Sequence, residues 1–251
     1  MRPLVVVSYN IHRGIGLDRR LDLDRTAAVL AETRPDVVAL QEVVRDPDGP
    51  HADQAAYLGT ALGMTLVMGE TRFWGDGTYG NAVLTRLPVL SVSRCDLSHG
   101  RREPRGALRV DLVCGDVAVH VFNAHLGLAF RERRAQVTAL RHLLRGARRR
   151  GPRVLLGDFN EWHPGPVTRR LRREFRSPMR RLWRTHPAPF PLFKLDRIYW
   201  DAELEGEDFR VHHSRLARVA SDHLPVVARL GLARAARVTA WVTGDALPPA
   251  E

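Results

Sequence analysis

The sequence predicts an α/β domain, because short strand-like runs alternate along the chain with amphipathic helical segments. The runs are apolar, several are rich in β-branched residues, and they end at polar or glycine residues, as buried strands do. With 251 residues, of which 44% are hydrophobic and 27% charged, the chain has an ordinary globular composition and suits one large domain. Wholesale disorder, collagen and a coiled-coil rod are therefore excluded.

The first predicted unit is a βαβ crossover, in which a helix connects the first two strands. Asp24 can cap this helix, which we expect to run to about Thr33, and Pro35 lies just beyond its end. Apolar runs of the strand type recur to the end of the domain. The predicted strands are Leu4–Val7, Val37–Leu40, Ala82–Leu84, Val117–Phe122, Val154–Leu156 and Leu224–Leu230.

Two further helices are predicted between these strands. Asp53 can cap one that runs to about Leu62. Residues 131–149 form the other, because their apolar side chains recur at helical spacing with arginines on the opposite face. The apolar face holds Val137, Leu140, Leu143 and Leu144.

We expect one domain over residues 1–231 and a tail over residues 232–251. The tail contains one more strand-like run, Val238–Val242, and then a turn-rich end from Gly244 that is expected to fray. No internal repeat or low-complexity linker divides the chain.

Charge is concentrated in one part of this basic chain, whose formal net charge is +11. Lys194 is its single lysine, so the bias is almost entirely arginine. Residues 131–184 hold 17 arginines against four acidic residues. This segment predicts either a positive surface for phosphate-rich ligands or a solvated face on arginine-rich helices.

The cysteines and the N-terminus indicate an intracellular protein. Cys95 and Cys114 form no CxxC pair and lie far from any histidine at zinc-finger spacing, which argues against a disulfide framework or structural zinc. The N-terminal apolar run is too short for a signal peptide, and no stretch approaches the roughly 18 apolar residues of a transmembrane helix. We expect a soluble cytoplasmic protein without stable membrane insertion, and a monomer by default.

Residues that chemistry can use stand at the ends of the predicted strands. Strand ends in an α/β sheet converge on one edge, and carboxylates gathered there are costly to bury without a compensating ligand. Mg²⁺ and Mn²⁺ prefer carboxylate and carbonyl oxygens, so we expect one of these ions as a cofactor. The residues are Asn10, His12, Gln41, Glu42, Asn123, His125, Asp158, Asn160, Asp196, Ser221, Asp222 and His223.

Part of this set, in this order, resembles the endonuclease/exonuclease/phosphatase superfamily, which has the pancreatic-DNase-like fold. The matching residues are Asn10, Gln41, Glu42, His125, residues 157–160, Asp196 and residues 221–223. The most specific pieces are the GDFN segment at residues 157–160 and the SDHLPV segment at residues 221–226. The N-terminal match, residues 10–14, is similar to a small bacterial subgroup. The resemblance implies a four-layer α/β sandwich of two packed mixed β-sheets flanked by helices, and metal-dependent hydrolysis of a phosphate ester.

The resemblance also implies a metal site and a group that activates water. Glu42 and Asn10 match the metal-binding pair of the family, and Asp222 completes the shell. Asp158 matches the residue that orients or deprotonates the attacking water. Asn160 can then donate an amide hydrogen to a phosphate oxygen.

Two histidines match further catalytic positions. His223 matches the catalytic histidine, and Asp196 is its expected carboxylate partner, which would favour the imidazolium form. Whether His223 acts as a base or as a cationic clamp stays open. His125 matches the second histidine of the DNase and sphingomyelinase branches, where the abasic-site repair branch has tyrosine.

Some positions depart from the family or have no assigned role. His12 stands where several relatives carry an acidic residue or an arginine. Glu103, Tyr79 and Asn81 fit the bacterial subgroup without an evident role. Arg105 could reach a phosphate, but we expect it to be a surface arginine beside a turn.

The tryptophans divide between a substrate surface and the core. Trp162 is expected to line the site, and Trp74 is equally suited to packing or to ligand contact. Trp183 and Trp200 are expected in the core.

A metal-dependent phosphodiesterase is the leading hypothesis, and its substrate is a phosphate ester of one of three classes. Positive charge favours nucleic acid, His125 favours phospholipid or sphingomyelin-type headgroups, and the compact chain favours a small phosphorylated metabolite. A catalytically silent phosphate- or nucleic-acid-binding protein would have lost an acid or histidine of the set, and none is lost. A dinucleotide-binding domain is disfavoured, because Gly14 and Gly16 lack the third glycine of that fingerprint.

Overall fold

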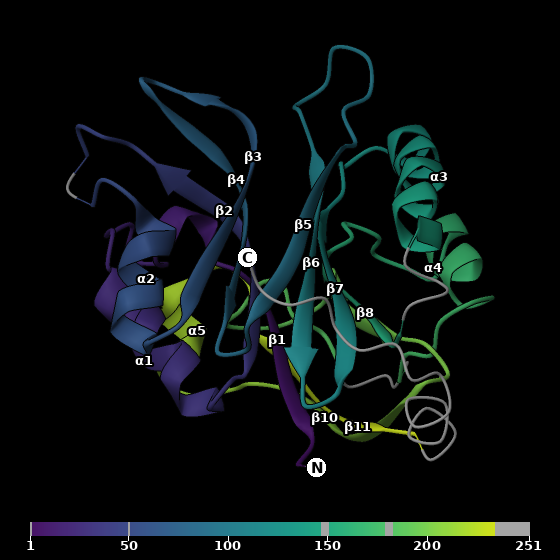
Figure 1. Ribbon diagram of the computed structural model, residues 1–251. Helices are drawn as coiled ribbons and strands as arrows, with labels where there is room; N and C mark the ends of the chain where they lie inside the picture. The colour runs from purple at the N-terminus through teal and green to yellow at the C-terminus, as the bar shows by residue number, and fades with distance from the viewer. Residues whose placement is uncertain (1, 50, 147–150, 179–182, 234–251) are drawn as a thin grey trace.

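Two β-sheets pack face to face, and helices cover the outer face of each, as Figure 1 shows. The computed structural model describes residues 2–49, 51–146, 151–178 and 183–233. The four-layer α/β sandwich implied by the resemblance is confirmed. Within the described residues, no helix has the length and apolar content that a membrane span requires.

The first sheet contains the predicted βαβ crossover. Strands β1 (Leu4–Asn10) and β2 (Val37–Arg45) pair in parallel and are joined through helix α1 (Leu23–Thr33). All other pairs in this sheet are antiparallel. The strand order is β10 (Leu204–Val211), β11 (Val226–Leu232), β1, β2, β4 (Gly77–Thr85) and β3 (Thr65–Trp74).

The second sheet is also mixed. Strands β7 (Val117–His125) and β8 (Arg153–Asp158) pair in parallel, and helix α3 (Phe130–Gly146) lies between them in the chain. The strand order is β5 (Val89–Asp96), β6 (Gly106–Cys114), β7, β8 and β9 (Asp196–Trp200). The shorter helical elements are η1 (His12–Gly14), α2 (Gln54–Leu62), α4 (Pro166–Leu171) and α5 (Ala217–Ala220).

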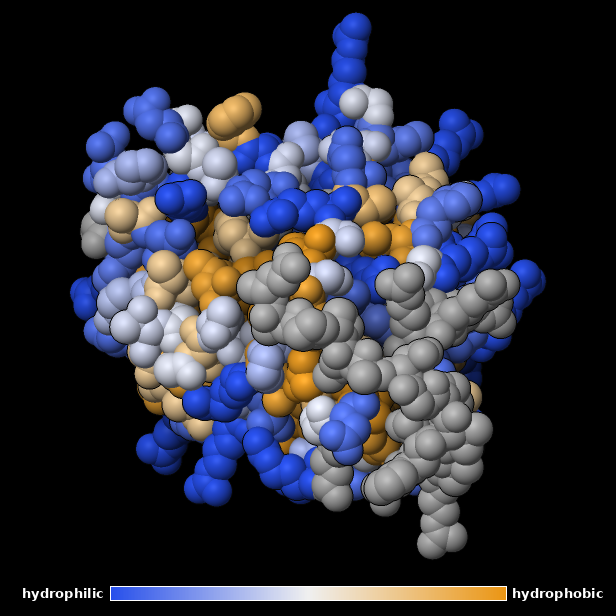
Figure 2. All heavy atoms as spheres, in the orientation of Figure 1, coloured by the Kyte–Doolittle hydropathy of each residue, from blue (hydrophilic) through white to orange (hydrophobic). Residues whose placement is uncertain are grey.

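Three apolar layers hold the four structural layers together. Leu30 and Leu58 belong to the layer between the helices α1, α2 and α5 and the first sheet. Val121 lies between the two sheets, and Leu140 packs between α3 and the second sheet. Burying each such side chain stabilises the fold by about 1.5–3 kcal/mol, so the stacked layers form a firm support for the site. On the face shown in Figure 2, hydrophobic side chains gather in the middle and hydrophilic ones surround them.

Five of the six predicted strands fall within observed strands and the sixth overlaps one, but their lengths and number differ from the prediction. The last begins at Val226 rather than Leu224. Strands β3, β5, β6, β9 and β10 were not among the predicted runs. Four of them, β3, β5, β9 and β10, lie at sheet edges, and in β3, β5 and β10 mixed exposure interrupts the apolar pattern.

The predicted helices form, with one correction at a cap. Asp22, not Asp24, caps α1, because its side chain accepts a hydrogen bond from the Arg25 backbone N–H, and Asp24 lies in the first turn. Asp53 caps α2 as predicted. Strand β11 ends at Leu232, one residue beyond the predicted domain boundary. The predicted strand over residues 238–242 lies outside the described residues.

Candidate active site

The register of the second sheet brings three predicted site residues side by side. Asp158 ends β8 and stands opposite His125, the last residue of the parallel strand β7. Strand β9 runs antiparallel to β8, so its first residue, Asp196, stands opposite Asp158 on the other side. Three distant parts of the sequence therefore meet at one edge of the sheet.

The first sheet presents its own residues at the same edge of the sandwich. Strand β1 ends at Asn10, and Glu42 lies within β2 at a bulge in its pairing with β4. The segment before β11 is tied to β1, because the Ser221 hydroxyl donates to the Asn10 carbonyl oxygen over 2.8 Å. Asp222 and His223 follow directly.

Strained backbone gathers at this edge. Of the six non-glycine residues with positive φ in the described chain, four lie here: His12 (46°), Arg13 (59°), Glu42 (58°) and Asn160 (49°). A left-handed conformation costs about 1–3 kcal/mol at such residues and persists only where the surrounding structure enforces it. The backbone strain that places these side chains therefore lowers the stability of the fold, which is typical of a functional site.

Asn10 joins the two sheets at the centre of the site. Its Nδ2 donates to Glu42 Oε1 over 3.1 Å and to Asp158 Oδ2 over 3.2 Å. Its Oδ1 accepts from the His12 backbone N–H over 3.0 Å. The amide thus holds two carboxylates from different sheets close together.

Asp158 is a buried carboxylate poised to change its protonation state. Its Oδ1 accepts from the Asn160 backbone N–H over 2.9 Å, and its Oδ2 lies 3.6 Å from His125 Nε2 and 3.8 Å from His223 Nε2. Burial, together with the nearby Asp196 carboxylate, raises the pKa of Asp158 to about 6. Raised carboxylate pKa values of this kind favour proton acceptance near neutral pH.

His223 is held by Asp196 as the sequence predicts. The His223 Nδ1–H donates to Asp196 Oδ2 over 2.7 Å. Burial opposes a charged ring, but the carboxylates of Asp196, Asp158 and Asp222 outweigh it and raise the pKa of His223 to about 10. The ring is therefore an imidazolium at neutral pH, with its Nε2–H on the side of Asp158.

His125 is neutral and has an arginine, not a carboxylate, beside its second nitrogen. Burial and the Arg105 guanidinium hold the pKa of His125 well below its ordinary value. Arg105 Nη1 lies 3.3 Å from His125 Nδ1, and because arginine can only donate, Nδ1 is the acceptor in any hydrogen bond between them. Nε2 lies 3.6 Å from Asp158 Oδ2 and 3.3 Å from Asn160 Nδ2, which is also a donor, so the neutral ring can accept from only one of Arg105 and Asn160.

Asp222 lies between two histidines. Its carboxylate is 3.9 Å from His12 Nδ1 and 3.6 Å from His186 Nε2. Burial opposes its charge, but hydrogen bonding to His186 and the charges of His223 and His12 hold the pKa of Asp222 well below its ordinary value. Asp222 is therefore ionised at neutral pH and can bind a cation.

The donors fit a hard divalent cation. Glu42, Asp158, Asp196 and Asp222 converge on this region, and the His223 imidazolium supplies only one positive charge. One oxygen of Asp196, Oδ1, is buried without a hydrogen-bond partner. Among the described residues, two groups of three acidic or histidine residues have ligand atoms within 4.8 Å of one another: Asp158, Asp196 and His223, and His186, Asp222 and His223. Carboxylate oxygens in this number suit Mg²⁺ or Mn²⁺.

Gln41 connects the two sheets behind the site. Its Nε2 donates to Asn123 Oδ1 over 2.8 Å, and Asn123 donates in turn to the carbonyl oxygens of Leu40 and Ala82. These buried amides tie β7 of the second sheet to β2 and β4 of the first. Gln41 and Asn123 thus position the strand ends on which Glu42 and His125 stand.

Sequence reasoning missed several residues of this region. Arg105 was expected at the surface, but it is only 7% exposed and contacts His125. The sequence feature that could have indicated its burial is its position directly before the buried strand β6, two residues after Glu103. His186 carried no strand-end signal, because it lies in an irregular segment.

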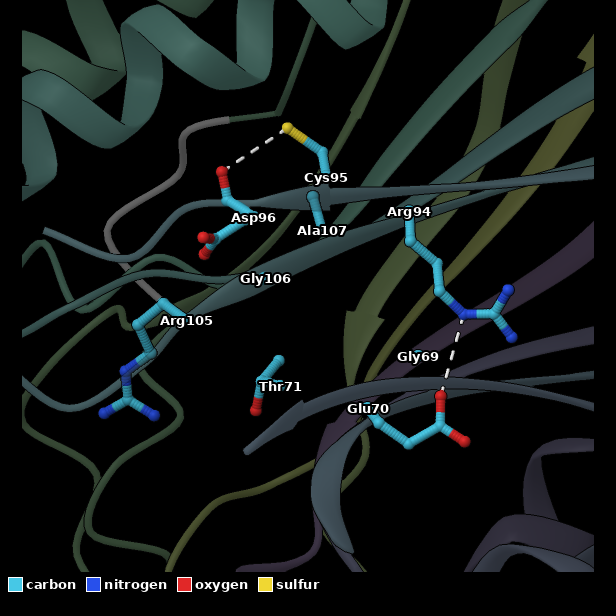
Figure 3. A pocket seen from close by; sticks show the side chains of 9 residues that line it. All are labelled: Gly69, Glu70, Thr71, Arg94, Cys95, Asp96, Arg105, Gly106 and Ala107. Carbon is cyan, nitrogen blue, oxygen red and sulfur yellow. Dashed lines mark hydrogen bonds and ion pairs between the residues drawn. The ribbon is translucent and has the colours of Figure 1, made fainter. Parts of the chain in front are cut away.

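Arg105 also borders a cavity of about 190 Å³ beside the site. Figure 3 shows this cavity between β3 and the strands β5 and β6, with Thr71 and Cys95 among its lining residues. The Arg105 guanidinium extends away from Cys95 and Ala107 in this view.

The tryptophans follow the prediction in part. Trp200 is buried, and Trp183 packs against Phe209. Trp162 is 57% exposed and lies against Phe193, so it remains open to a ligand. Trp74 contacts Tyr79.

Comparison with known proteins places the chain among relatives of the same architecture. The model of the endonuclease/exonuclease/phosphatase family matches residues 7–223. The uncharacterized protein YbhP of Escherichia coli K12 is 30% identical over 243 residues, which cover 90% of this chain and 96% of YbhP.

Solved structures agree with the sequence comparison. An endonuclease/exonuclease/phosphatase from Beutenbergia cavernae superposes with a TM-score of 0.76 at 26% identity, over 92% of this chain and 72% of that one. A mannosyl-6-phosphatase from Bacteroides thetaiotaomicron has the same TM-score at 19% identity, over 91% of this chain and 100% of that one, and shares the fold. Together with the match of the family model over most of its length, these likenesses show that the chain belongs to the endonuclease/exonuclease/phosphatase family.

Proposed function

We propose that this protein is a divalent-metal-dependent phosphodiesterase that hydrolyses P–O bonds by attack of water, with nucleic acid as the favoured substrate. The observation that carries the proposal is the pairing of a buried carboxylate with a buried imidazolium. Asp158 Oδ2 and His223 Nε2 lie 3.8 Å apart, and their pKa values place a base and a cation together at neutral pH.

The side chains have complementary tasks in such a reaction. Asp158 accepts the proton of the attacking water, because its raised pKa suits proton transfer near neutral pH. The His223 Nε2–H donates to a phosphoryl oxygen, where negative charge develops, and Asp196 keeps the ring oriented. His125 and the Asn160 amide lie beside each other where they can contact other oxygens of the same phosphate.

Glu42, Asn10 and Asp222 would hold the metal ion. When bound, a divalent cation supplies Lewis-acid polarisation of the phosphoryl group and stabilises the leaving oxygen. Glu42 and Asp222 offer carboxylate oxygens for this task. Asn10 donates its amide nitrogen to both Glu42 and Asp158, so it also fixes the distance between the metal site and the base.

Charge supports nucleic acid as the substrate class. The chain carries a formal net charge of +11, and arginines dominate its basic residues. A polyanion would bind such a surface with a steep salt dependence, because each phosphate contact releases counterions. A small phosphorylated metabolite is the second candidate, since the structurally similar mannosyl-6-phosphatase is named for one.

The test is hydrolysis of bis(p-nitrophenyl) phosphate with and without Mg²⁺ or Mn²⁺. We expect turnover that EDTA abolishes and added metal restores. A parallel screen over DNA, RNA, sugar phosphates and phospholipids identifies the class, and binding that weakens steeply with salt supports nucleic acid. Turnover that survives EDTA, or that is equal in His223→Ala, would contradict the proposal, and a protein that binds DNA without cleaving any ester would be a silent binding protein.

A further inference from the structure

Three arginines and two aromatic residues form a continuous cluster beside the catalytic groups. Arg72, Trp74 and Tyr79 come from strands β3 and β4, and Arg13 comes from η1. Arg105 comes from the segment that leads into β6. We call these five residues the arginine–aromatic cluster.

The aromatic rings fix the positions of two guanidinium groups. The Arg72 guanidinium lies 4.8 Å from the Trp74 ring centroid and 4.4 Å from that of Tyr79. The Arg13 guanidinium lies 5.6 Å from the Trp74 centroid, and the Trp74 and Tyr79 rings stack at 5.8 Å. Guanidinium groups held over aromatic faces keep their N–H edges available to other acceptors.

Both ends of the cluster meet the catalytic site. At one end, Arg105 Nη1 lies 3.3 Å from His125 Nδ1. At the other, Arg13 Nη2 lies 3.1 Å from His12 Nε2, and His12 is the neighbour of Asp222. The cluster therefore extends along the site from His125 to His12.

The cluster carries more positive charge than its own acid neutralises. Glu103 is its acidic partner, with Oε1 3.2 Å from Arg72 and Oε2 2.9 Å from Arg105. Arg13 has no carboxylate partner among the ion pairs of the described residues. Glu103 thus neutralises one of the three guanidinium charges.

The cluster also holds donors without a partner. The Nε atoms of Arg13, Arg72 and Arg105 are buried without a hydrogen-bond partner, as are those of Arg25, Arg141 and Arg170 elsewhere in the described chain. An oxygen-rich anion would supply the acceptors that the cluster lacks.

We propose that the arginine–aromatic cluster binds a second phosphate group of the substrate, next to the phosphate that is cleaved. The proposal rests on the proposed phosphoesterase function. Arginine forks match phosphate oxygens in pairs, and the excess charge and free donors of the cluster suit a dianion. The Trp74 ring is engaged with two guanidinium groups and with Tyr79, so the cluster presents donors to an anion rather than an open ring face to a base.

Binding of inorganic phosphate to the metal-free protein tests the cluster without any activity. Isothermal titration in a His223→Ala background removes the catalytic imidazolium as another anion site. We expect Arg72→Gln to weaken phosphate binding about tenfold, a typical loss for one charged contact. Glu103→Gln is expected to tighten it, because it removes the acid that competes with the anion.

Arg169→Gln is the matched control, since Arg169 is exposed on α4 and the variant makes the same change in net charge. Its phosphate affinity should equal that of the parent. Equal affinity in the parent, Arg72→Gln and Arg169→Gln would overturn the proposal. If Arg72→Gln unfolds, Arg72→Lys replaces it, because lysine keeps the charge but loses the fork, and an affinity equal to the parent's would again overturn the proposal.

A pair of chromogenic substrates tests the position of the second phosphate. The p-nitrophenyl ester of thymidine 5′-phosphate is compared with the same ester that also carries a 3′-phosphate. We expect kcat/KM to be at least about tenfold higher for the second, mainly through KM, and this ratio to fall toward one in Arg72→Gln. A wild-type ratio near one would overturn the placement of this subsite.

The two measurements separate this proposal from the proposed function. If neither ester is hydrolysed but phosphate binding depends on Arg72, the phosphodiesterase function fails and the anion site stands. If both esters are hydrolysed equally and the affinity for phosphate does not depend on Arg72, the proposed anion site is wrong and the phosphodiesterase function stands.

Discussion

Replacing Asp158 by asparagine is expected to lower kcat for phosphodiester hydrolysis by about 10³-fold, the scale of a lost general base. The amide has almost the same shape and can still accept from the Asn160 backbone N–H. It cannot take a proton from water. The measurement is steady-state hydrolysis of bis(p-nitrophenyl) phosphate at saturating Mg²⁺ or Mn²⁺.

The same substitution is expected to stabilise the metal-free protein or leave its stability unchanged. Folding raises the pKa of Asp158, so keeping its carboxylate ionised above about pH 6 costs folding free energy. Asparagine removes that cost, and the gain should disappear at pH values below the pKa of the unfolded state, where aspartate is protonated in both states. Thermal unfolding at pH 7.5 and at pH 3 compares the two conditions.

Asp116→Asn is the control for this pair of measurements, because Asp116 is exposed between β6 and β7. It should leave both kcat and the melting temperature unchanged. Asp158→Asn with more than about a tenth of wild-type kcat would show that Asp158 is not the base. A variant that loses both activity and stability would indicate a structural role instead.

Gly157→Ala is expected to destabilise the fold by about 4 kcal/mol or more, or to prevent folding altogether. Gly157 has a φ of 145°, which side chains rarely adopt, and a Cβ there would lie 1.8 Å from the Ala124 carbonyl oxygen. Ala124 is the register partner of Gly157 in the parallel pairing of β7 and β8. Relief of the clash would push these strands apart next to His125 and Asp158.

Gly100→Ala is the control for the glycine substitution. Gly100 also has a positive φ, 61°, but no atom lies within 4 Å of a Cβ built there. Its cost should be only the left-handed backbone penalty of about 1–2 kcal/mol. Urea denaturation of both variants separates the penalty of the left-handed backbone from the steric clash with Ala124. An equal loss of unfolding free energy in the two variants would contradict the role given to the β7–β8 contact.

Periodicity alone predicted the central strands of the fold except β6 and missed the four edge strands. Val6, Val38 and Val154 lie in strands whose two faces are both covered by other layers, so continuous apolar runs mark them. Strand β5, with the sequence VLSVSRCD, has no buried residue, so no continuous apolar run marks it as a strand. The layer arrangement came from the family resemblance, because pairing between strands distant in the sequence leaves no local pattern.

The sequence predicted much of the candidate site, because its residues stand at strand ends. Asp158, Asp196 and His223 come together as expected. Sequence reasoning could not find Arg105 beside His125, since that contact depends on the turn before β6 and on the neighbouring Glu103. His186 was missed because it lies in an irregular segment and does not follow a predicted strand.

The most direct test of the site as a whole is the anomalous scattering of Mn²⁺ in crystals of this protein soaked with the ion. The account predicts an anomalous peak for a manganese ion that is bound by the Glu42 carboxylate and lies between Glu42, Asn10 and Asp222. An anomalous map with no peak at Glu42, or with manganese only at sites remote from Glu42, Asp158 and Asp222, would contradict a shared cation at this edge of the sandwich.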